Sequence, residues 1–291
     1  MGHGIAQVFA CAGHEVRITD PVAETRAGIL ARIKANVGEL GHDSGAVARI
    51  EVLNTLQACV AGADIIIEAA PENLELKQQI FADVERVASP AAILASNTSV
   101  IPITMIMSQI TNKARALGTH WWNPPYLVPL VEVVRTSESS DETITATIDL
   151  LRRVGKKPVE VKKDVPGFVG NRLQHALWRE AIALIANGVC DAKTVDDVVK
   201  SSFGARLAVL GPIENADLVG LDLTRAIHGY VFPALDRATE PSPYLDRLIA
   251  EGRLGFKSNH GFRDWPPEAQ AALRTKVANH LKASFGAMDG D

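Results

Sequence analysis

Cysteine, long apolar runs and excess basic charge are all scarce in this sequence, and each shortage excludes a class of protein. Only three of the 291 residues are cysteine, they lie far apart, and no Cys-x-x-Cys pair occurs. An odd number of scattered cysteines argues against a disulfide framework and a zinc site, and favours free thiols in a reducing compartment. We therefore expect no metal and a cytoplasmic protein.

Membrane and nucleic-acid partners are excluded on similar grounds. No apolar run reaches the roughly 20 residues that a membrane-spanning helix needs, and the first residues lack the basic segment of a signal peptide. The net charge is −4 and the basic residues form no dense stripe, as a nucleic-acid interface would require. A small molecule is the expected partner.

The chain instead shows two kinds of pattern, which divide it near residue 163. Up to that point short β-type runs alternate with helical segments, which is typical of a doubly wound α/β domain. From residue 164 to 291 helical periodicity dominates. We predict a Rossmann-type domain over 1–163 and an all-α domain over 164–291. Ser139, with Glu142 three residues later, predicts a capping box for the helix that follows. The strand candidates are EVRITD (15–20), ADIIIEAA (63–70), AAILAS (91–96), ARALGTH (114–120), LVEVVRT (130–136) and KPVEVKK (157–163).

The first twenty residues, MGHGIAQVFACAGHEVRITD, look like part of a dinucleotide-binding βαβ unit. Gly2 and Gly4 open a helix, and the strand that follows ends in Asp20. In such a unit the pyrophosphate lies at the helix N-terminus and the carboxylate binds the adenosine ribose, which favours NAD over NADP. From the residues alone, the glycine pair could equally serve helix packing, and Asp20 could cap a helix.

A set of longer motifs resembles the L-3-hydroxyacyl-CoA dehydrogenase family. The motifs, in chain order, are EAAPENLELK (68–77), SNTS (96–99), GTHWWNPPYLVPLVEVVR (118–135), KKDVPGFVGNRL (162–173), GPIENADLVGLD (211–222) and LGFKSNHGF (254–262). The resemblance runs through nearly the whole chain. It implies NAD as cofactor and a helical C-terminal domain that carries substrate contacts and forms a homodimer.

The family pattern begins with a strand and G-x-G-x-M-G-x-G-I-A, whereas this chain starts at that Met. We therefore expect the first strand of the βαβ unit to be missing, through a start codon assigned too far downstream or a truncation. Its absence should leave unpaired backbone groups in the sheet.

The resemblance also implies roles for individual residues. His120 matches the general base and Glu132 the carboxylate that orients it, while Ser99 and Asn171 match groups that bind the substrate oxygen. Glu72, Lys77 and Asn97 match contacts to the nicotinamide half of the cofactor, which adds them to Gly2, Gly4 and Asp20.

Each of these residues also has a purely structural interpretation. His120 could be a packed imidazole, and Glu132 an outward residue of an edge strand. The remaining side chains could cap helices or form ion pairs: Asn97, Ser99 and Asn171 as caps, and Lys77 with Glu72 or another surface acid.

Three hypotheses stay open for the function, and the first two differ in the substrate. The first is oxidation of a short-chain L-3-hydroxyacyl-CoA to the 3-ketoacyl-CoA, in fatty acid metabolism. The second is the same chemistry on a free hydroxy carboxylate, as in relatives of the L-gulonate, L-carnitine and pyridine-carboxylate dehydrogenase type. The stretch after Asp20 has only Arg26, Arg32 and Lys34 as basic residues, few for the phosphates of CoA. The third is a non-catalytic protein like λ-crystallin.

Overall fold

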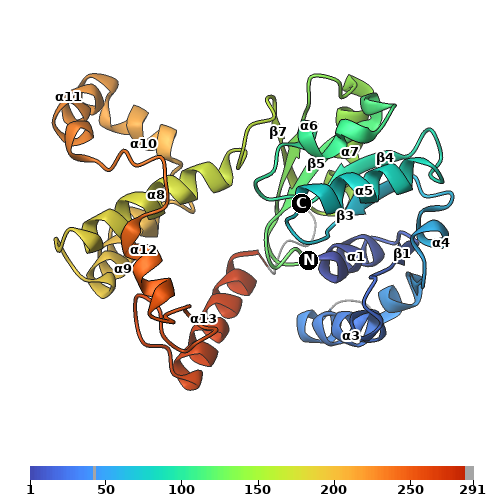
Figure 1. The fold of residues 1–291 in the computed structure, drawn as a ribbon, viewed down its shortest axis with the longest axis horizontal. Helices are drawn as coiled ribbons and strands as arrows, with labels where there is room; N and C mark the ends of the chain where they lie inside the picture. Colours follow the sequence, from blue (N-terminus) through green and yellow to red (C-terminus); the bar gives the residue numbers. More distant parts are fainter. Residues whose placement is uncertain (42–43, 286–291) are drawn as a thin grey trace. The chain divides into compact units, whose positions relative to one another are not determined.

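The computed structural model describes residues 1–41 and 44–285, and the chain forms two compact units (Figure 1). The first contains residues 1–172 and the end of the last helix from Ala278, and the second contains Leu173–Val277. The first unit is an α/β unit, and the second consists of helices and loops. The predicted fold class is confirmed. The boundary near residue 163 stays a prediction.

The first unit contains all six predicted strands and one short strand, β2, that was not predicted. Its strands are β1 (Val16–Ile18), β2 (Ile50–Val52), β3 (Ile65–Glu68), β4 (Ile93–Ser96), β5 (Ala116–Trp121), β6 (Leu130–Val134) and β7 (Lys157–Val161). Its helices are α1 (Gly2–Cys11), α2 (Ala23–Ala27), α3 (Ile29–Leu40), α4 (Leu56–Val60), α5 (Leu74–Glu85), α6 (Ile103–Ile106) and α7 (Asp141–Arg153).

These strands form two separate sheets. One is the parallel pair β1-β2, and the other has the order β3-β4-β5-β6-β7, in which only β5 and β6 are antiparallel. Gly2 lies between the two sheets, because a Cβ on it would be 3.9 Å from Ile18 in β1 and 3.9 Å from Ala69, just after β3. The start of α1 therefore lies between the two sheets.

Helices cover both faces of the larger sheet, and successive side chains of its strands pack against them alternately. Leu94 and Ala116 pack with α5 and α6 on one face, and their neighbours Ala95 and Leu117 pack with α1 and α7 on the other. A strand covered on both faces is apolar without alternation, which explains the run in β3. The carboxyl ends of β3, β4 and β5 are thereby held rigidly side by side.

The start of α7 differs from the prediction. Ser140, not Ser139, is the N-cap, and its side chain accepts a hydrogen bond from the Thr143 N–H. The Ser139 hydroxyl instead donates to the Ala116 carbonyl at 2.6 Å and accepts from the Thr136 N–H at 3.0 Å. The predicted capping box is therefore wrong by one residue, because Ser139 satisfies buried backbone groups.

The helices of the second unit bury little of their surface. No residue of α9, α10 or α11 is buried. Within residues 1–41 and 44–285, no helix is long and apolar enough to cross a membrane. The helices are α8 (Gly170–Ala186), which starts in the first unit, α9 (Ala192–Ser201), α10 (Pro212–Val219), α11 (Leu221–Val231), α12 (Pro243–Ala250) and α13 (Pro267–Phe285), which ends in the first unit.

Candidate active site

The antiparallel pairing of β5 with β6 brings His120 and Glu132 together. The register places the two residues directly opposite each other, and the imidazole Nδ1 lies 2.7 Å from the carboxylate Oε2. Both residues are buried, with exposed fractions of 3% and 1%. Because β6 lies between β5 and β7, Glu132 is not on an edge strand.

The second oxygen of Glu132 is held by the backbone. Its Oε1 accepts hydrogen bonds of 3.0 Å from the N–H groups of Val169 and Gly170. Burial alone would raise the pKa of Glu132, but the hydrogen bonds from His120, Gly170 and Val169 hold it below its ordinary value. An ionised carboxylate only accepts hydrogen bonds, so the shared proton resides on Nδ1 of His120. The lone pair is then on Nε2, where a general base needs it.

A tight turn aims these two N–H groups at Glu132. Gly167 and Phe168 both have positive φ angles, of 74° and 50°, and a non-glycine residue in that region is strained. The Phe168 ring is buried, with its centroid 5.8 Å from that of His120. Gly170 leaves room for Trp122, because a Cβ there would lie 2.5 Å from Cζ2 of the indole. The turn and the aromatic rings thus fix the histidine–carboxylate pair.

Asn171, in the first turn of α8, is tied to Ser99. Its amide Nδ2 donates to the Ser99 carbonyl at 2.8 Å, so this side chain does not cap its own helix. The half-buried Ser99 hydroxyl makes no hydrogen bond within the described part of the chain. That hydroxyl is the free donor of the pair.

Glu72 holds the segment that carries Ser99. Its carboxylate accepts from the Thr98 hydroxyl and from the N–H groups of Ser99, Val100 and Ile101, the latter three at 3.2, 3.2 and 3.3 Å. Burial raises the pKa of Glu72, but the Thr98 hydroxyl, the N–H groups of Val100 and Ile101 and the Lys77 charge together lower it below its ordinary value. Glu72 is therefore an ionised anchor for the loop after β4.

Lys77 lies completely buried beside Glu72. Its ammonium bonds Glu68 at 2.8 Å and the Ala70 carbonyl at 3.1 Å, and lies 3.8 Å from Glu72. Glu68 was not singled out from the sequence. It also accepts from the Ser96 hydroxyl at 2.7 Å. The sequence does carry a signal for Glu68, because it is a carboxylate at the end of an apolar strand, nine residues before Lys77.

Asn97 completes the group at the ends of the strands. Its side-chain oxygen accepts from the Trp121 N–H at 2.9 Å and so links the end of β4 to the end of β5. The structure thus connects seven of the predicted site residues, either by a direct contact or through a residue next to one of them in the chain. They are Glu72, Lys77, Asn97, Ser99, His120, Glu132 and Asn171.

The three other predicted residues lie around α1. Gly2 starts the helix between β1 and β3, while Gly4 packs against Pro125, whose Cγ would lie 2.6 Å from an added Cβ. Asp20 follows β1 and accepts from the Val22 N–H at 2.9 Å, within its own segment. This arrangement fits a dinucleotide. At Gly2 no side chain obstructs the N-terminus of α1, and the Asp20 carboxylate follows the next strand.

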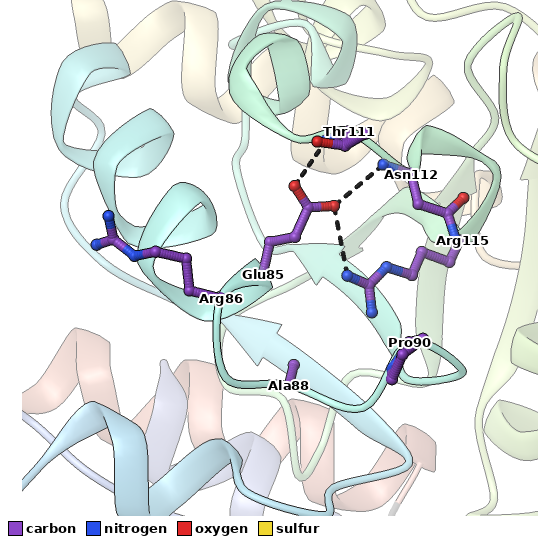
Figure 2. A pocket seen from close by; sticks show the side chains of 7 residues that line it. All are labelled: Glu85, Arg86, Ala88, Pro90, Thr111, Asn112 and Arg115. Carbon is purple, nitrogen blue, oxygen red and sulfur yellow. Dashed lines mark hydrogen bonds and ion pairs between the residues drawn. The ribbon is translucent and has the colours of Figure 1, made fainter.

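The described residues contain no cluster that could hold a metal, and a surface hollow of the first unit lies away from the predicted site residues. No group of three or more His, Cys, Asp or Glu residues within 1–41 and 44–285 has metal-binding geometry. Figure 2 shows a hollow around Glu85, whose carboxylate accepts from the N–H groups of Thr111 and Asn112 and from Arg115. Every Glu85 oxygen is therefore occupied, and none of the predicted site residues lines this hollow.

Comparison with known proteins gives a consistent result along the chain. Residues 1–165 match the family model "3-hydroxyacyl-CoA dehydrogenase, NAD binding domain", and residues 167–265 match "3-hydroxyacyl-CoA dehydrogenase, C-terminal domain". A probable 3-hydroxybutyryl-CoA dehydrogenase of Bacillus subtilis is 37% identical over 91% of this chain and 94% of its own length.

A second kind of relative matches over the full length. The 5-formyl-3-hydroxy-2-methylpyridine 4-carboxylate 5-dehydrogenase of Mesorhizobium japonicum is 33% identical over 100% of this chain and 96% of its own length. A crystal structure of an enzyme of that name, described as an NAD+-dependent dismutase, superposes with a TM-score of 0.90, at 33% identity, over 97% of this chain and 93% of the other.

Proposed function

Because this chain belongs to the 3-hydroxyacyl-CoA dehydrogenase family and is an NAD-binding oxidoreductase, we propose that it oxidises a substrate hydroxyl to a carbonyl with His120 as general base. The observation that carries this proposal is the buried pair of His120 and Glu132, with Nδ1 and Oε2 2.7 Å apart. A base oriented in this way by an ionised carboxylate is ready to accept a proton on Nε2.

The chain's own residues divide the remaining work. His120 Nε2 takes the hydroxyl proton, and the Glu132 carboxylate stabilises the imidazolium that results. The free Ser99 hydroxyl and the amide of Asn171 bind the substrate oxygen. When bound, NAD supplies the acceptor for the hydride that leaves the carbinol carbon.

Binding of the cofactor is assigned to the residues around α1 and β3. Gly2 lets the dinucleotide approach the α1 N-terminus, while Gly4 supports that turn through its close packing with Pro125. The Asp20 carboxylate binds the adenosine ribose and repels a 2′-phosphate. Glu72 and Asn97 line the nicotinamide half. Lys77 acts indirectly, because its fully buried ammonium bonds Glu68 and the Ala70 carbonyl and lies 3.8 Å from Glu72, which it helps to hold in place.

A short-chain L-3-hydroxyacyl-CoA is the first candidate substrate. The B. subtilis relative carries a name of this type, and its similarity spans most of both chains. The reaction would yield the 3-ketoacyl-CoA.

A free hydroxy carboxylate is the second candidate, and two observations favour it. The M. japonicum relative, named for a pyridine carboxylate, matches the whole chain, including the residues beyond 265 where the family model ends. In addition, Arg26 and Arg32 direct their guanidinium groups to nearby backbone carbonyls, at 2.5 Å from Asp20 O and 2.8 Å from Thr25 O. They are thereby less available to bind CoA phosphates.

Formation of NADH tests the reaction and the choice of substrate together. L-3-hydroxybutyryl-CoA, free L-3-hydroxybutyrate and its methyl ester are offered in parallel to the wild type and to His120→Gln. We expect the variant to lose about 10²- to 10⁴-fold in kcat. Turnover of the thioester alone supports the acyl-CoA candidate, and turnover of the acid but not the ester supports the free carboxylate. Wild-type activity that survives in His120→Gln contradicts the proposal.

We also propose a homodimer formed through the second unit. Its support is the number of large apolar side chains that α8, α10 and α11 expose, among them Ile213, Leu218 and Tyr230 at 75%, 73% and 88%.

A further inference from the structure

Lys156 is a buried cation without a carboxylate partner. It follows α7 in the turn before β7, where Gly155 adopts a φ of 77°, and only 9% of its surface is exposed. Its ammonium donates to the carbonyls of Pro125 and Val128, at 2.5 and 3.1 Å. It also lies 5.8 Å from the centre of the Trp121 ring. No acidic side chain of the described residues forms an ion pair with it.

Burying a charge in this way is unfavourable on its own. Burial is the sole cause that lowers the pKa of Lys156, to about 8. Lysines are rarely buried unless they are paired. Among the residues that the structure describes, two carbonyls and the aromatic face compensate this charge, and all three belong to the end of β5 or the connection that follows.

That connection joins the two catalytic strands. It runs from Trp121, next to His120, to Leu130, two residues before Glu132. Within it the N–H groups of Leu127 and Val128 both bond the Pro124 carbonyl, at 3.0 Å each. The connection is thus a closed turn, and the Lys156 ammonium holds it from the side of α7 and β7.

On its other side the same turn presses against α1. A Cβ on Gly4 would meet Pro125 Cγ at 2.6 Å and Tyr126 Cδ1 at 3.3 Å. Interiors packed this closely transmit small displacements. A shift of Pro125 would therefore move the first turn of α1 relative to His120.

We propose that Lys156 is a positioning residue, which clamps the β5–β6 connection against the first turn of α1 and so fixes the bound dinucleotide relative to His120. This inference rests on the proposed function, in which α1 holds the cofactor and His120 is the base. A misplacement of about 1 Å far from the reacting atoms can reduce a rate by about 10²-fold. A buried clamp that touches neither substrate nor cofactor can therefore control catalysis.

The test compares Lys156→Met, which keeps the aliphatic volume, with Lys156→Arg and with Lys157→Met at the exposed neighbouring position. We expect Lys156→Met to raise the dissociation constant of NADH, measured by fluorescence, and to lower kcat, each by about tenfold. The primary deuterium isotope effect should rise, because hydride transfer becomes slower. Lys156→Arg should recover part of the loss, and Lys157→Met should stay within about twofold of the wild type.

A double-mutant cycle with Pro125→Ala separates positioning from general destabilisation. This change removes the ring that touches Gly4 but keeps the carbonyl that Lys156 binds. If Lys156 acts through the turn, the effects of the two substitutions on NADH affinity are less than additive. Folded Lys156→Met with wild-type NADH affinity, or full additivity, overturns the inference. Should Lys156→Met fail to fold, wild-type affinity in Pro125→Ala overturns it as well.

The same measurements keep the two proposals apart. A wild type that binds NADH but oxidises neither substrate contradicts the proposed function, while the NADH affinities still decide the role of Lys156. Loss of activity in His120→Gln combined with an unaffected Lys156→Met contradicts only the positioning role.

Discussion

Glu132 is the residue on which most of the site depends, because its two oxygens serve different partners. One oxygen orients His120 and the other holds the backbone of Val169 and Gly170. Glu132→Gln should lower kcat by about 10- to 100-fold, since the amide stabilises an imidazolium less well. Steady-state kinetics check this, with Glu160→Gln on the exposed face of β7 as the control that keeps wild-type kcat.

The same substitution has a pH-dependent effect on stability. The pKa of Glu132 is lower in the folded chain than its ordinary value of 4.5. Its ionised form therefore stabilises the fold above that value, and the contribution is lost as the pH falls through the lowered folded pKa. The difference in unfolding free energy between wild type and Glu132→Gln should be largest at neutral pH and shrink in acid. A difference that grows in acid contradicts the assignment.

Gly170 is a second residue whose identity the site requires. Gly170→Ala drives a methyl group into the Trp122 ring, which packs on His120 with centroids 5.2 Å apart. We expect a loss of about 1–3 kcal/mol in unfolding free energy and a lower kcat. The control is Gly38→Ala, in an open position of α3, which should stabilise the chain by about 0.5–1 kcal/mol. Equal effects in denaturant titrations would contradict the steric argument.

The residues that could be predicted from the sequence are those with a recognisable order along the chain. The motifs that contain His120 and Glu132 predicted a catalytic pair, and the register of β5 and β6 brings these residues together. Glu68 and the Phe168 turn were not predicted. Their significance depends on contacts with residues 28 and 37 positions away along the chain, which no local pattern records.

Among the structural elements, strands were easier to predict than their pairing and their ends. Short β-type runs predicted β3 to β6, but β2 is three residues long and has the sequence Ile-Glu-Val, which shows no run. The start of α7 was wrong by one residue because Ser139 and Ser140 are both good capping residues. The Ala116 carbonyl and the Thr136 N–H, which both bond the Ser139 hydroxyl, decide between them.

The segment between β7 and α8 begins with Asp164, which caps the N-terminus of α6. The Asp164 carboxylate accepts from the Ile103 N–H at 3.0 Å and from the N–H and hydroxyl of Thr104 at 2.7 Å. Asp164→Ala should lower the free energy of unfolding by about 0.5–2 kcal/mol, the usual effect of losing a helix cap, here that of α6. Asp149→Ala, which removes an exposed pair with Arg152, should cost less than about 0.5 kcal/mol. Thermal and chemical unfolding compare the two, and similar losses would contradict the capping role.

At the scale of the molecule, the two units differ in how much of their apolar surface they bury. The first unit buries three apolar clusters, which include α1, α3, α5, α6 and α7. The helices α9, α10 and α11 of the second unit contain no buried residue. Large exposed apolar patches mark interaction surfaces. A symmetric dimer brings the same patch of both copies together.

A dimer through the second unit makes a prediction with a matched control. Ile227 of α11 and Val159 of β7 are both 45% exposed, but only Ile227 belongs to the proposed interface. Sedimentation should give twice the chain mass of 31.2 kDa for the wild type, the monomer mass for Ile227→Asp and the dimer mass for Val159→Asp. A buried aspartate at an apolar interface lacks a partner, which makes association unfavourable. A wild type that sediments as a monomer at all concentrations contradicts the dimer. A dimer that survives Ile227→Asp places the exposed face of α11 outside the interface.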